Sequence, residues 1–349
     1  MSRESSFAWA LVGPGRIAGR FAEAVTQLPG MHLAAVVGRD AARAAAFAAR
    51  WPQGEEGALP RAGDDLAALL TDPAIDGVYV ATPHAQHGAV VRACLQAGKA
   101  VLCEKSLVPT RAEAEPLAAL ARERRVFLME ALWTRFLPVY QRVGAWLREG
   151  RIGELRAIQS SFCFPAPYDP ASRLFDPALA GGALLDVGVY SLSVTRWALQ
   201  QQTPGGRCPE FEQLQVRGAL APTGVDLRFH ATLDFPGGIV AQHYCALDAS
   251  GDNALRLIGS RGHIVLPQRF WQATEARLQL HGEPEAEVAS LPFAINGFEG
   301  EIEEAVRCVR AGLIESPHMP LDESLATLGW MDEIRRRLGV RYPFETEVA

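Results

Sequence analysis

Lys105 is the residue with the clearest potential for chemistry. A short run of small or apolar residues, 100–103, ends in Glu104. Lys105 comes directly after this acid and is followed by Ser106. The chain contains 34 lysines and arginines, yet lysine occurs only at Lys99 and Lys105. Lysine can lose its proton when it is desolvated or lies near another cation, whereas arginine practically never does. Two interpretations are open: Lys105 takes part in proton transfer, or it is a surface lysine paired with Glu104.

Asp186 and Tyr190 form a second candidate pair. They stand four residues apart in the segment Gly-Gly-Ala-Leu-Leu-Asp-Val-Gly-Val-Tyr, where a helical pattern begins. Residues four apart lie on one face of an α-helix, so the carboxylate and the phenol would share a face. The pair could hold or transfer a proton. Taken alone, the spacing favours the simpler interpretation, in which Asp186 caps the helix while Tyr190 packs in the core.

Gly13, Gly15 and Ala18 form the pattern G-x-G-x-x-A between an apolar run and a helical pattern. The run, residues 8–12, predicts a buried strand. Gly13 permits a tight turn, Gly15 lets the backbone approach a pyrophosphate, and Ala18 allows close packing of the helix. The free amides at the start of the helix then face the phosphates. This context favours dinucleotide binding over a merely structural turn.

The end of the second predicted strand, residues 33–37, bears on the kind of dinucleotide. Gly38 occupies the position where NAD enzymes place a carboxylate on the ribose, and Arg39 could hold the extra phosphate of NADP. Arg39 therefore indicates NADP. NAD stays possible, because Asp40 would be that acid if the strand ended two residues later. Asp40 also precedes an alanine-rich helical pattern, as an N-cap should, and we favour the cap.

A further group of polar residues follows the predicted strand 77–81. Thr82 and Pro83 come directly after it, and His84 and His87 follow. Open α/β sheets bind ligands at the carboxyl ends of their strands. The H-x-x-H spacing could suggest a metal, but two histidines without a nearby carboxylate or thiolate are weak grounds, so no metal is expected. The predicted cofactor-binding residues are Gly13, Gly15, Arg16, Ile17, Ala18, Gly38, Arg39, Thr82, Pro83, His84, His87, Glu104 and Lys105.

Strand and helix patterns alternate steadily in the first part of the chain. The predicted strands are residues 8–12, 33–37, 77–81, 100–103 and 126–130. Such alternation predicts a parallel, doubly wound Rossmann sheet. A chain of 349 residues exceeds the usual size of one core, so two domains are expected. We expect a dinucleotide-binding domain over residues 1–131 and a substrate-binding and dimerisation domain over residues 132–349.

The second part of the chain predicts an α/β domain with an open, largely antiparallel mixed sheet. The strand-like runs are residues 155–162, 216–220, 226–235, 239–246, 255–258 and 263–266. Helical patterns at 299–311 and 322–338 end the chain. Because helices can cover only part of such a sheet, we expect a second copy of the chain to cover the rest, forming a homodimer through this sheet.

Composition excludes several classes of partner. A formal net charge of −6 argues against nucleic acid, because nucleic-acid-binding proteins gather cations to neutralise phosphates. No run of 18 apolar residues occurs, so no membrane partner is expected. The six cysteines stand singly, without a C-x-x-C pair, which favours reduced thiols in the cytoplasm. A small molecule is the expected ligand.

Several motifs, in this order over more than half of the chain, resemble the Gfo/Idh/MocA family, named for glucose-fructose oxidoreductase and inositol dehydrogenase. They are the Gly13-to-Ala18 turn, Ala81-Thr-Pro83, Glu104-Lys105 and residues 181–190. Residues 129–138 and the tyrosine at the end of the D-x-x-x-H/Y pattern are most similar to one branch. That branch contains dimeric dihydrodiol dehydrogenases and NADP-dependent xylose dehydrogenases.

The resemblance implies a Rossmann domain followed by an α/β domain whose open sheet often forms a dimer face. It also implies reversible hydride transfer between NAD(P) and a hydroxyl or carbonyl of a carbohydrate-like substrate: a sugar, polyol or diol. Lys105 matches the lysine of the family's E-K-P motif, and Asp186 and Tyr190 match the D-x-x-x-H/Y positions. This sequence departs at Ser106, which replaces the usual proline, and at Tyr190, which replaces the commoner histidine.

The expected chemistry assigns roles to these residues, because a proton must leave the substrate hydroxyl as the hydride moves to the nicotinamide. Tyr190 is expected to be the general acid/base, Lys105 to hydrogen-bond the reacting oxygen and favour the ionised phenol, and Asp186 to orient substrate or lysine. The roles of Lys105 and Tyr190 could be exchanged. The side chains expected to line the substrate pocket are Trp133, Arg135, Phe162, Tyr168 and Arg173. Two alternatives remain: an NADP-binding regulator or scaffold without chemistry, and a dehydrogenase of amino acids or biliverdin.

Overall fold

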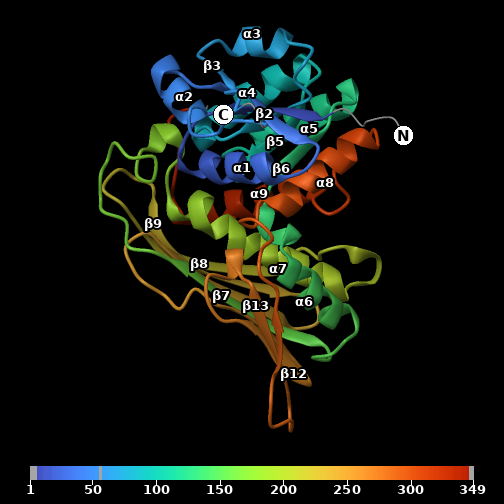
Figure 1. Ribbon diagram of the computed structural model, residues 1–349. Helices are drawn as coiled ribbons and strands as arrows, with labels where there is room; N and C mark the ends of the chain where they lie inside the picture. The colour runs from blue at the N-terminus through green and yellow to red at the C-terminus, as the bar shows by residue number, and fades with distance from the viewer. Residues whose placement is uncertain (1–5, 55–56, 346–349) are drawn as a thin grey trace. The chain divides into compact units, whose positions relative to one another are not determined.

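The computed structural model describes residues 6–54 and 57–345, and the chain forms two compact units (Figure 1). The first unit consists of Met1–Trp133 and Ala294–Leu325, and the second of Thr134–Phe293 and Ala326–Ala349. The sequence predicts one boundary near residue 131. The structure differs from this prediction because the chain returns to the first unit, where α8 (Glu299–Arg310) packs against α1 (Arg16–Gln27) and β5 (Ala100–Glu104).

The first unit contains a six-stranded sheet in the order β3-β2-β1-β4-β5-β6. All its paired strands are parallel. The remaining strands are β1 (Phe7–Val12), β2 (Met31–Val37), β3 (Arg61–Gly63), β4 (Gly77–Val80) and β6 (Leu128–Ala131). The remaining helices are α2 (Ala41–Ala48), α3 (Leu66–Thr71), α4 (His84–Gln96) and α5 (Arg111–Arg124). This is the predicted doubly wound arrangement, with β3 as a short addition in a stretch that the sequence presents as a loop.

The order of the strands brings the candidate residues to one edge of this sheet. Strands β1, β4 and β5 are buried along their whole length, as in parallel sheets covered on both faces. Because all run in the same direction, the turns after them lie at the same carboxyl edge. The Gly13 turn follows β1, Thr82 follows β4 and Lys105 follows β5, and β4 pairs with both of the others.

The second unit contains an eight-stranded mixed sheet in the order β14-β13-β12-β11-β7-β10-β9-β8. Strands β7 and β10 are parallel, and the other neighbours are antiparallel. The strands are β7 (Leu155–Cys163), β8 (Gln213–Leu220), β9 (Asp226–Phe235), β10 (Ile239–Ala246), β11 (Leu255–Gly259), β12 (Gly262–Leu266), β13 (Glu275–Leu280) and β14 (Glu287–Ser290). The predicted mixed sheet is present, extended by β13 and β14.

Helices cover one face of this sheet (Figure 1). They are α6 (Pro138–Arg148), α7 (Val189–Gln202), the π-turn η3 (Leu184–Gly188) that leads into α7, and the second-unit part of α9 (Leu321–Leu338). Side chains such as Phe229, Leu233 and Phe235 alternate toward this face and are buried. The opposite face carries no helix from the described part of the chain.

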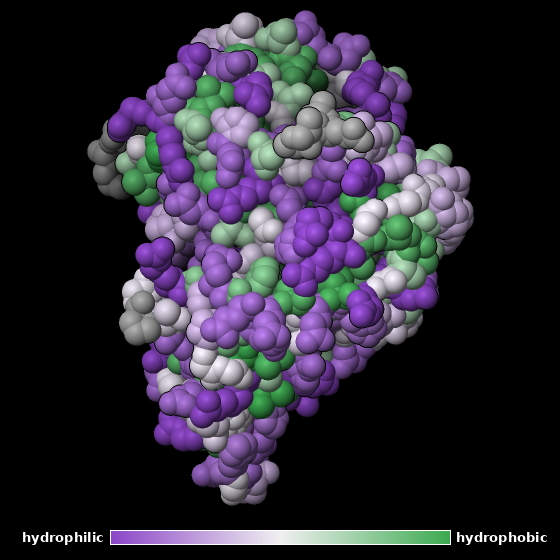
Figure 2. Space-filling view, turned by 180° about the vertical axis from the view of Figure 1, so that it is seen from behind, coloured by the Kyte–Doolittle hydropathy of each residue, from purple (hydrophilic) through white to green (hydrophobic). Residues whose placement is uncertain are grey.

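The segment Pro177–Gln202 is long and apolar enough to cross a membrane, with a hydropathy of 1.4. However, 89% of its most apolar window is buried inside the protein, as expected for a core helix. On the side of the molecule in Figure 2, hydrophobic residues form separate areas among hydrophilic ones.

Candidate active site

The glycine turn after β1 has the geometry that a dinucleotide requires. Gly13 has a φ of +96°, and a Cβ there would lie 2.7 Å from the Ala81 carbonyl carbon. Only glycine therefore permits the close contact between the ends of β1 and β4. At Gly15 the situation is the opposite, because a Cβ would meet nothing in the described structure nearer than the Gly13 oxygen at 4.0 Å. Open space thus faces the backbone of Gly15.

Polar groups without hydrogen-bond partners among the described residues lie in the turns that follow β1 and β4. Helix α1 begins after Gly15 without a side-chain cap from the described residues, which leaves its first amides available. Arg16 and Ile17, the first residues of α1, are exposed. The hydroxyl of Thr82 is buried and has no hydrogen-bond partner among the described residues. Free amides at a helix start bind phosphates, so these groups fit a dinucleotide.

The residues after β2 favour an arginine that contacts the extra phosphate of NADP over a carboxylate that contacts the ribose of NAD. A Cβ at Gly38 would lie 2.8 Å from Cδ of Pro14, so an acid at that position would require the proline ring to shift. The Asp40 carboxylate accepts the amides of Ala42 and Arg43 at 2.9 and 3.1 Å, and it therefore caps α2 as predicted. Arg39 is exposed and makes no hydrogen bond or ion pair with another described residue.

The turn that carries Lys105 is held by two buried side chains that the sequence analysis did not assign to it. The Glu130 carboxylate accepts the amide of Leu107 at 3.0 Å and the hydroxyl of Ser324 at 2.6 Å. The ring of His87 is fully buried, with its nitrogens 3.0 Å from the Ser106 carbonyl oxygen and 2.7 Å from the Thr82 carbonyl oxygen. Burial lowers the pKa of His87.

These contacts change the interpretation of His87. Its ring joins the turn after β5 to the turn after β4, because both ring nitrogens lie within hydrogen-bond distance of backbone carbonyl oxygens in these turns. His84, at the start of α4, is also buried and lies edge-on to His87 with a centroid distance of 5.7 Å. No cluster of three metal-ligating side chains occurs among the residues that the structure describes.

The two lysines of the chain have different environments. The Lys99 ammonium donates to the carbonyl oxygens of Asp72 and Ile75 at 2.6 and 2.8 Å, which is a structural role. Lys105 is half-buried at the carboxyl edge of the sheet, and its peptide bond to Ser106 is cis. The neighbouring Glu104 carboxylate accepts the hydroxyl of Tyr79.

In the second unit, Asp186 lies in the π-turn η3 and does not cap a helix. Its carboxylate is 7% exposed and accepts a hydrogen bond from the guanidinium of Arg173 at 2.8 Å. Arg173 comes from the loop before η3 and is about half exposed. The ion pair joins this loop to the helix that carries the candidate acid/base.

Tyr190 lies in the first turn of α7 beside an aromatic group. Its ring centroid is 5.6 Å from that of Phe162, and Phe162 stacks on Trp271 at 3.4 Å. Tyr190 and Phe162 are 7% and 8% exposed, so both residues are largely buried. A ring with apolar faces could pack against this group.

The other expected pocket residues have different positions. Tyr168 is 49% exposed in the loop before η3 and packs edge-on against Phe175. Arg135 is buried, and its Nε donates to the Ser193 hydroxyl at 3.2 Å. Trp133 is buried in the first unit against Phe298. Phe162, one of the five residues expected to line a pocket, is in ring contact with Tyr190.

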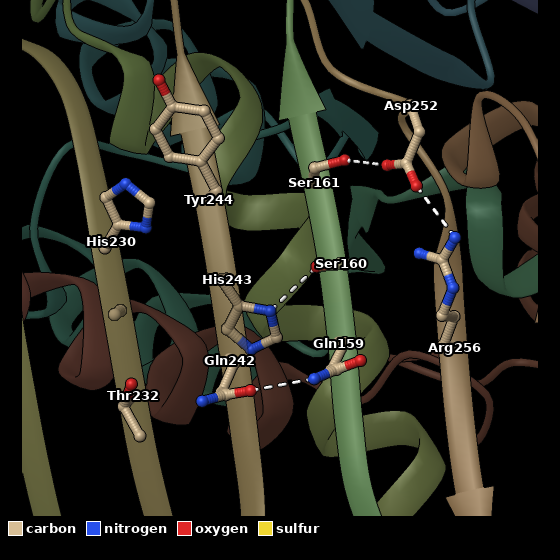
Figure 3. Close-up of a pocket in the computed structure, with 11 residues that line it drawn as sticks. Gln159, Ser160, Ser161, His230, Thr232, Gln242, His243, Tyr244, Asp252 and Arg256 are labelled. Atoms are coloured by element: carbon tan, nitrogen blue, oxygen red, sulfur yellow. Dashed lines mark hydrogen bonds and ion pairs between the residues drawn. The ribbon is translucent and has the colours of Figure 1, made fainter.

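A shallow depression of about 340 Å³ lies on the open face of the second sheet. Figure 3 shows polar side chains from β7, β9 and β10 around it. Gln159 donates a hydrogen bond to Gln242, and Ser161 donates one to Asp252. This depression is on the sheet face opposite α7, and it therefore belongs to a different surface from Tyr190.

Comparisons with known proteins assign both parts of the chain to one family. The family model described as "Oxidoreductase family, NAD-binding Rossmann fold" matches residues 7–132. The model described as "GFO/IDH/MocA C-terminal domain" matches residues 140–265.

Relatives extend this similarity over nearly the whole chain. The trans-1,2-dihydrobenzene-1,2-diol dehydrogenase of Homo sapiens is 34% identical over 96% of this chain and 98% of its own length. The enzyme of the same name from Macaca fascicularis is 35% identical over the same shares.

Solved structures are also similar to this chain over nearly its whole length. A 3-ketoreductase from Actinomadura kijaniata, in complex with NADP and TDP-benzene, is 28% identical with a TM-score of 0.80, covering 95% of this chain and 98% of its own. An aldose-aldose oxidoreductase from Caulobacter crescentus, 24% identical, shares the fold with a TM-score of 0.82 over 96% of this chain and 98% of its own. The chain belongs to the Gfo/Idh/MocA family of oxidoreductases with an NAD-binding Rossmann fold.

Proposed function

We propose that the chain transfers a hydride between NADP and a hydroxyl or carbonyl group of a sugar, polyol or diol. One observation carries this proposal: Lys105 follows β5 at the same sheet edge as the open glycine turn after β1, with only β4 between the two strands. A cation at that edge lies where the family's redox cofactor binds. The family membership supports an enzyme over a regulator that only binds NADP.

The groups that would hold the dinucleotide all belong to the first unit. The free amides of α1 and the open space at Gly15 suit the pyrophosphate. The unpartnered hydroxyl of Thr82 is a further donor. The exposed guanidinium of Arg39 suits the additional phosphate of NADP. When bound, the nicotinamide gives or accepts the hydride.

The remaining chemistry is proton transfer at the reacting oxygen. Tyr190 gives or takes this proton as the general acid/base, and Lys105 donates a hydrogen bond to the same oxygen and stabilises negative charge on it. Asp186, held by Arg173 at 2.8 Å, orients the substrate or Lys105. Exchange of the roles of Lys105 and Tyr190 remains an alternative within this proposal.

The aromatic neighbours of Tyr190 support a substrate with an apolar ring face. Phe162 and Trp271 offer flat, apolar surfaces beside the phenol. A cyclic diol or the C–H face of a pyranose would pack against them. The names of the relatives, which are dehydrogenases of a cyclic diol, support the first of these.

Substitution of the two proposed catalytic residues tests the proposal. Lys105→Ala and Tyr190→Phe should each lower turnover by about a hundredfold or more, because each removes a group that handles the reacting proton. Lys99→Ala is the matched control, since it removes the other lysine and should lower thermal stability but keep turnover. Wild-type rates in either catalytic variant would contradict the assignment.

The same assay identifies the substrate class. NADP reduction is followed with trans-diols and aldoses, and NADPH oxidation with diketones and deoxy-sugars. An NADP-binding scaffold would change NADPH fluorescence on binding without consuming it under any of these conditions.

We further propose that the chain works in the cytoplasm as a homodimer. The free thiols of all six cysteines support that compartment. The open face of the second sheet supports a second copy as partner, because its half-buried side chains, among them Tyr244, Thr232 and Gln159, have no cover from the described chain.

A further inference from the structure

Asp226, the first residue of β9, is a buried carboxylate without an assigned role. It is 0% exposed. Its Oδ2 accepts the amide of Leu184 at 2.6 Å, and Leu184 is the first residue of η3. Its Oδ1 has no hydrogen-bond partner among the described residues. The carboxylate therefore makes its contact with the start of the segment that carries Asp186 and Tyr190.

Two successive glycines allow the close packing around this carboxylate: Gly182 leaves space for the carboxylate itself, and Gly181 leaves space for the backbone of Leu174. Gly182 has a φ of +118°, and a Cβ there would lie 2.2 Å from Oδ1 of Asp226. A Cβ at Gly181 would lie 2.7 Å from the Leu174 carbonyl oxygen. The Gly181–Gly182 turn is thus enclosed between the loop that carries Arg173 and the carboxylate of Asp226.

Tyr342 holds the same turn from the C-terminal segment. Its hydroxyl donates to the Gly181 carbonyl oxygen at 2.9 Å, and its ring lies 5.0 Å below the guanidinium of Arg335. Arg335 in turn pairs with Asp332 and Glu345. Burial raises the pKa of Asp226 to about 7, an increase that the Leu184 amide and the charge of Arg335 oppose.

We propose that Asp226, assisted by Tyr342, is a positioning residue that sets where η3 begins and thereby where Asp186 and Tyr190 stand. The contact acts through the backbone: Asp186 is two residues beyond Leu184, and Tyr190 is in the next turn. A displacement of about 1 Å in a reacting group can cost about a hundredfold in rate. This inference rests on the proposed function, because it takes Tyr190 as the acid/base.

The test compares the two ends of one helical segment. Asp226→Ala removes the contact at its start, whereas Gln202→Ala removes one at its end, where Gln202 accepts the Leu155 amide at 2.9 Å and donates to the Gly153 carbonyl oxygen at 2.9 Å. Both variants should lose thermal stability. Asp226→Ala alone should lose about ten- to a hundredfold in kcat, with KM and the Kd for NADPH near their wild-type values.

Asp226→Asn provides the conservative rescue, because its amide oxygen can still accept the Leu184 N–H, and it should recover most of the lost kcat. The inference is overturned if Asp226→Ala keeps its kcat, if Gln202→Ala loses as much, or if the asparagine variant recovers nothing. Where the alanine variant does not fold, Tyr342→Phe decides: a lower kcat at constant KM supports the inference, and an unchanged kcat overturns it.

Tyr190→Phe separates this inference from the proposed function. If Tyr190→Phe retains full activity, the proposed acid/base is wrong. If Tyr190→Phe is inactive while the variants of Asp226 and Tyr342 turn over normally, only the positioning role is wrong.

Discussion

Arg39 and Gly38 together bear on which dinucleotide the first unit prefers. Arg39 is exposed and carries no ion pair with another described residue, so its charge is available to a ligand. We expect Arg39→Asp to weaken NADPH binding by roughly tenfold or more, about 1.4 kcal/mol, and to spare NADH. Arg92→Asp, an exposed arginine on α4, is the control and should change neither affinity. Fluorescence titration measures both, and an unchanged preference in Arg39→Asp would contradict NADP selectivity through this residue.

Gly38 also predicts a limit on redesign of the cofactor preference. An acid at this position would resemble the NAD-binding arrangement, but its Cβ would lie 2.8 Å from Cδ and 3.0 Å from Cγ of the Pro14 ring. We expect Gly38→Asp to lower the free energy of unfolding by roughly 1–3 kcal/mol, because the proline ring must shift. Denaturant unfolding measures this loss. Wild-type stability together with a gain in NADH affinity would show that the turn accommodates the side chain.

The sequence allowed us to predict which candidate residues follow the strands, but not which side chains hold the turns at the strand ends. The sequence places Lys105 and Thr82 after buried strands, and parallel pairing then brings them to one edge. The hydrogen bond from the Leu107 amide to Glu130 could not be derived from the sequence, because it joins residues 23 apart along the chain. The only available signal is that Glu130, like Glu104, is an acid at the end of an apolar run.

Helix η3 with α7 is the element whose geometry the sequence describes least well. A spacing of four residues suggests that Asp186 and Tyr190 share the face of a regular helix. The structure has a π-turn over Leu184–Gly188 instead, and Asp186 pairs with Arg173 outside it. A hydrophobic pattern cannot report a local π-turn, since burial on all sides leaves no polar face to fix the period. Strands β13 and β14 were also not predicted from the sequence. Strand β13 has an alternating pattern, Glu-Ala-Arg-Leu-Gln-Leu, that could have identified it, whereas β14 is an edge strand of only four residues.

The buried carboxylate of Asp226, which accepts the amide of Leu184 at the start of this element, predicts a pH dependence of stability. Asp226 has a pKa of about 7 in the folded chain against 3.8 for an ordinary aspartate. Between these pH values the unfolded chain has released the proton and the folded chain still holds it. The free energy of unfolding therefore falls as the pH rises from about 4 to about 7, by an amount on the order of 2–4 kcal/mol.

Asp226→Asn isolates this contribution, because the amide does not titrate. Urea unfolding of wild type and variant at several pH values should show the stability of the wild type, relative to the variant, decreasing from pH 4 to pH 7 and then levelling. A constant difference across this range would mean that the carboxylate titrates normally.

At the scale of the whole molecule, the open sheet face predicts the oligomeric state. Thr232 lies in β9 at the depression shown in Figure 3, and Thr232→Arg would add a bulky charge to a face that the proposed homodimer covers. We expect the wild type to sediment as a dimer and this variant to shift toward the monomer, because an unpaired charge at the centre of an interface is strongly unfavourable. Thr71→Arg, on exposed α3, serves as the control. A monomeric wild type would contradict the proposed partner.

The two-unit plan was predictable from length and from the change between alternating and hairpin patterns. The path of the chain was not, because the segment Ala294–Leu325 shows no feature in the sequence that assigns it to the first unit. Helix α8 is amphipathic, but its apolar face could pack against either unit, so the sequence does not determine which one it joins.

The return of α8 has a practical consequence for anyone who wishes to study the nucleotide half alone. A fragment that stops at residue 131 would lack the helix that packs against α1 and β5, and would leave their apolar side chains in water. Such a fragment should aggregate unless the missing helix is supplied, for example by fusing residues 294–325 through a flexible tether. A single crossover between related genes could not exchange this half either, because its two segments meet the other unit at three points along the chain.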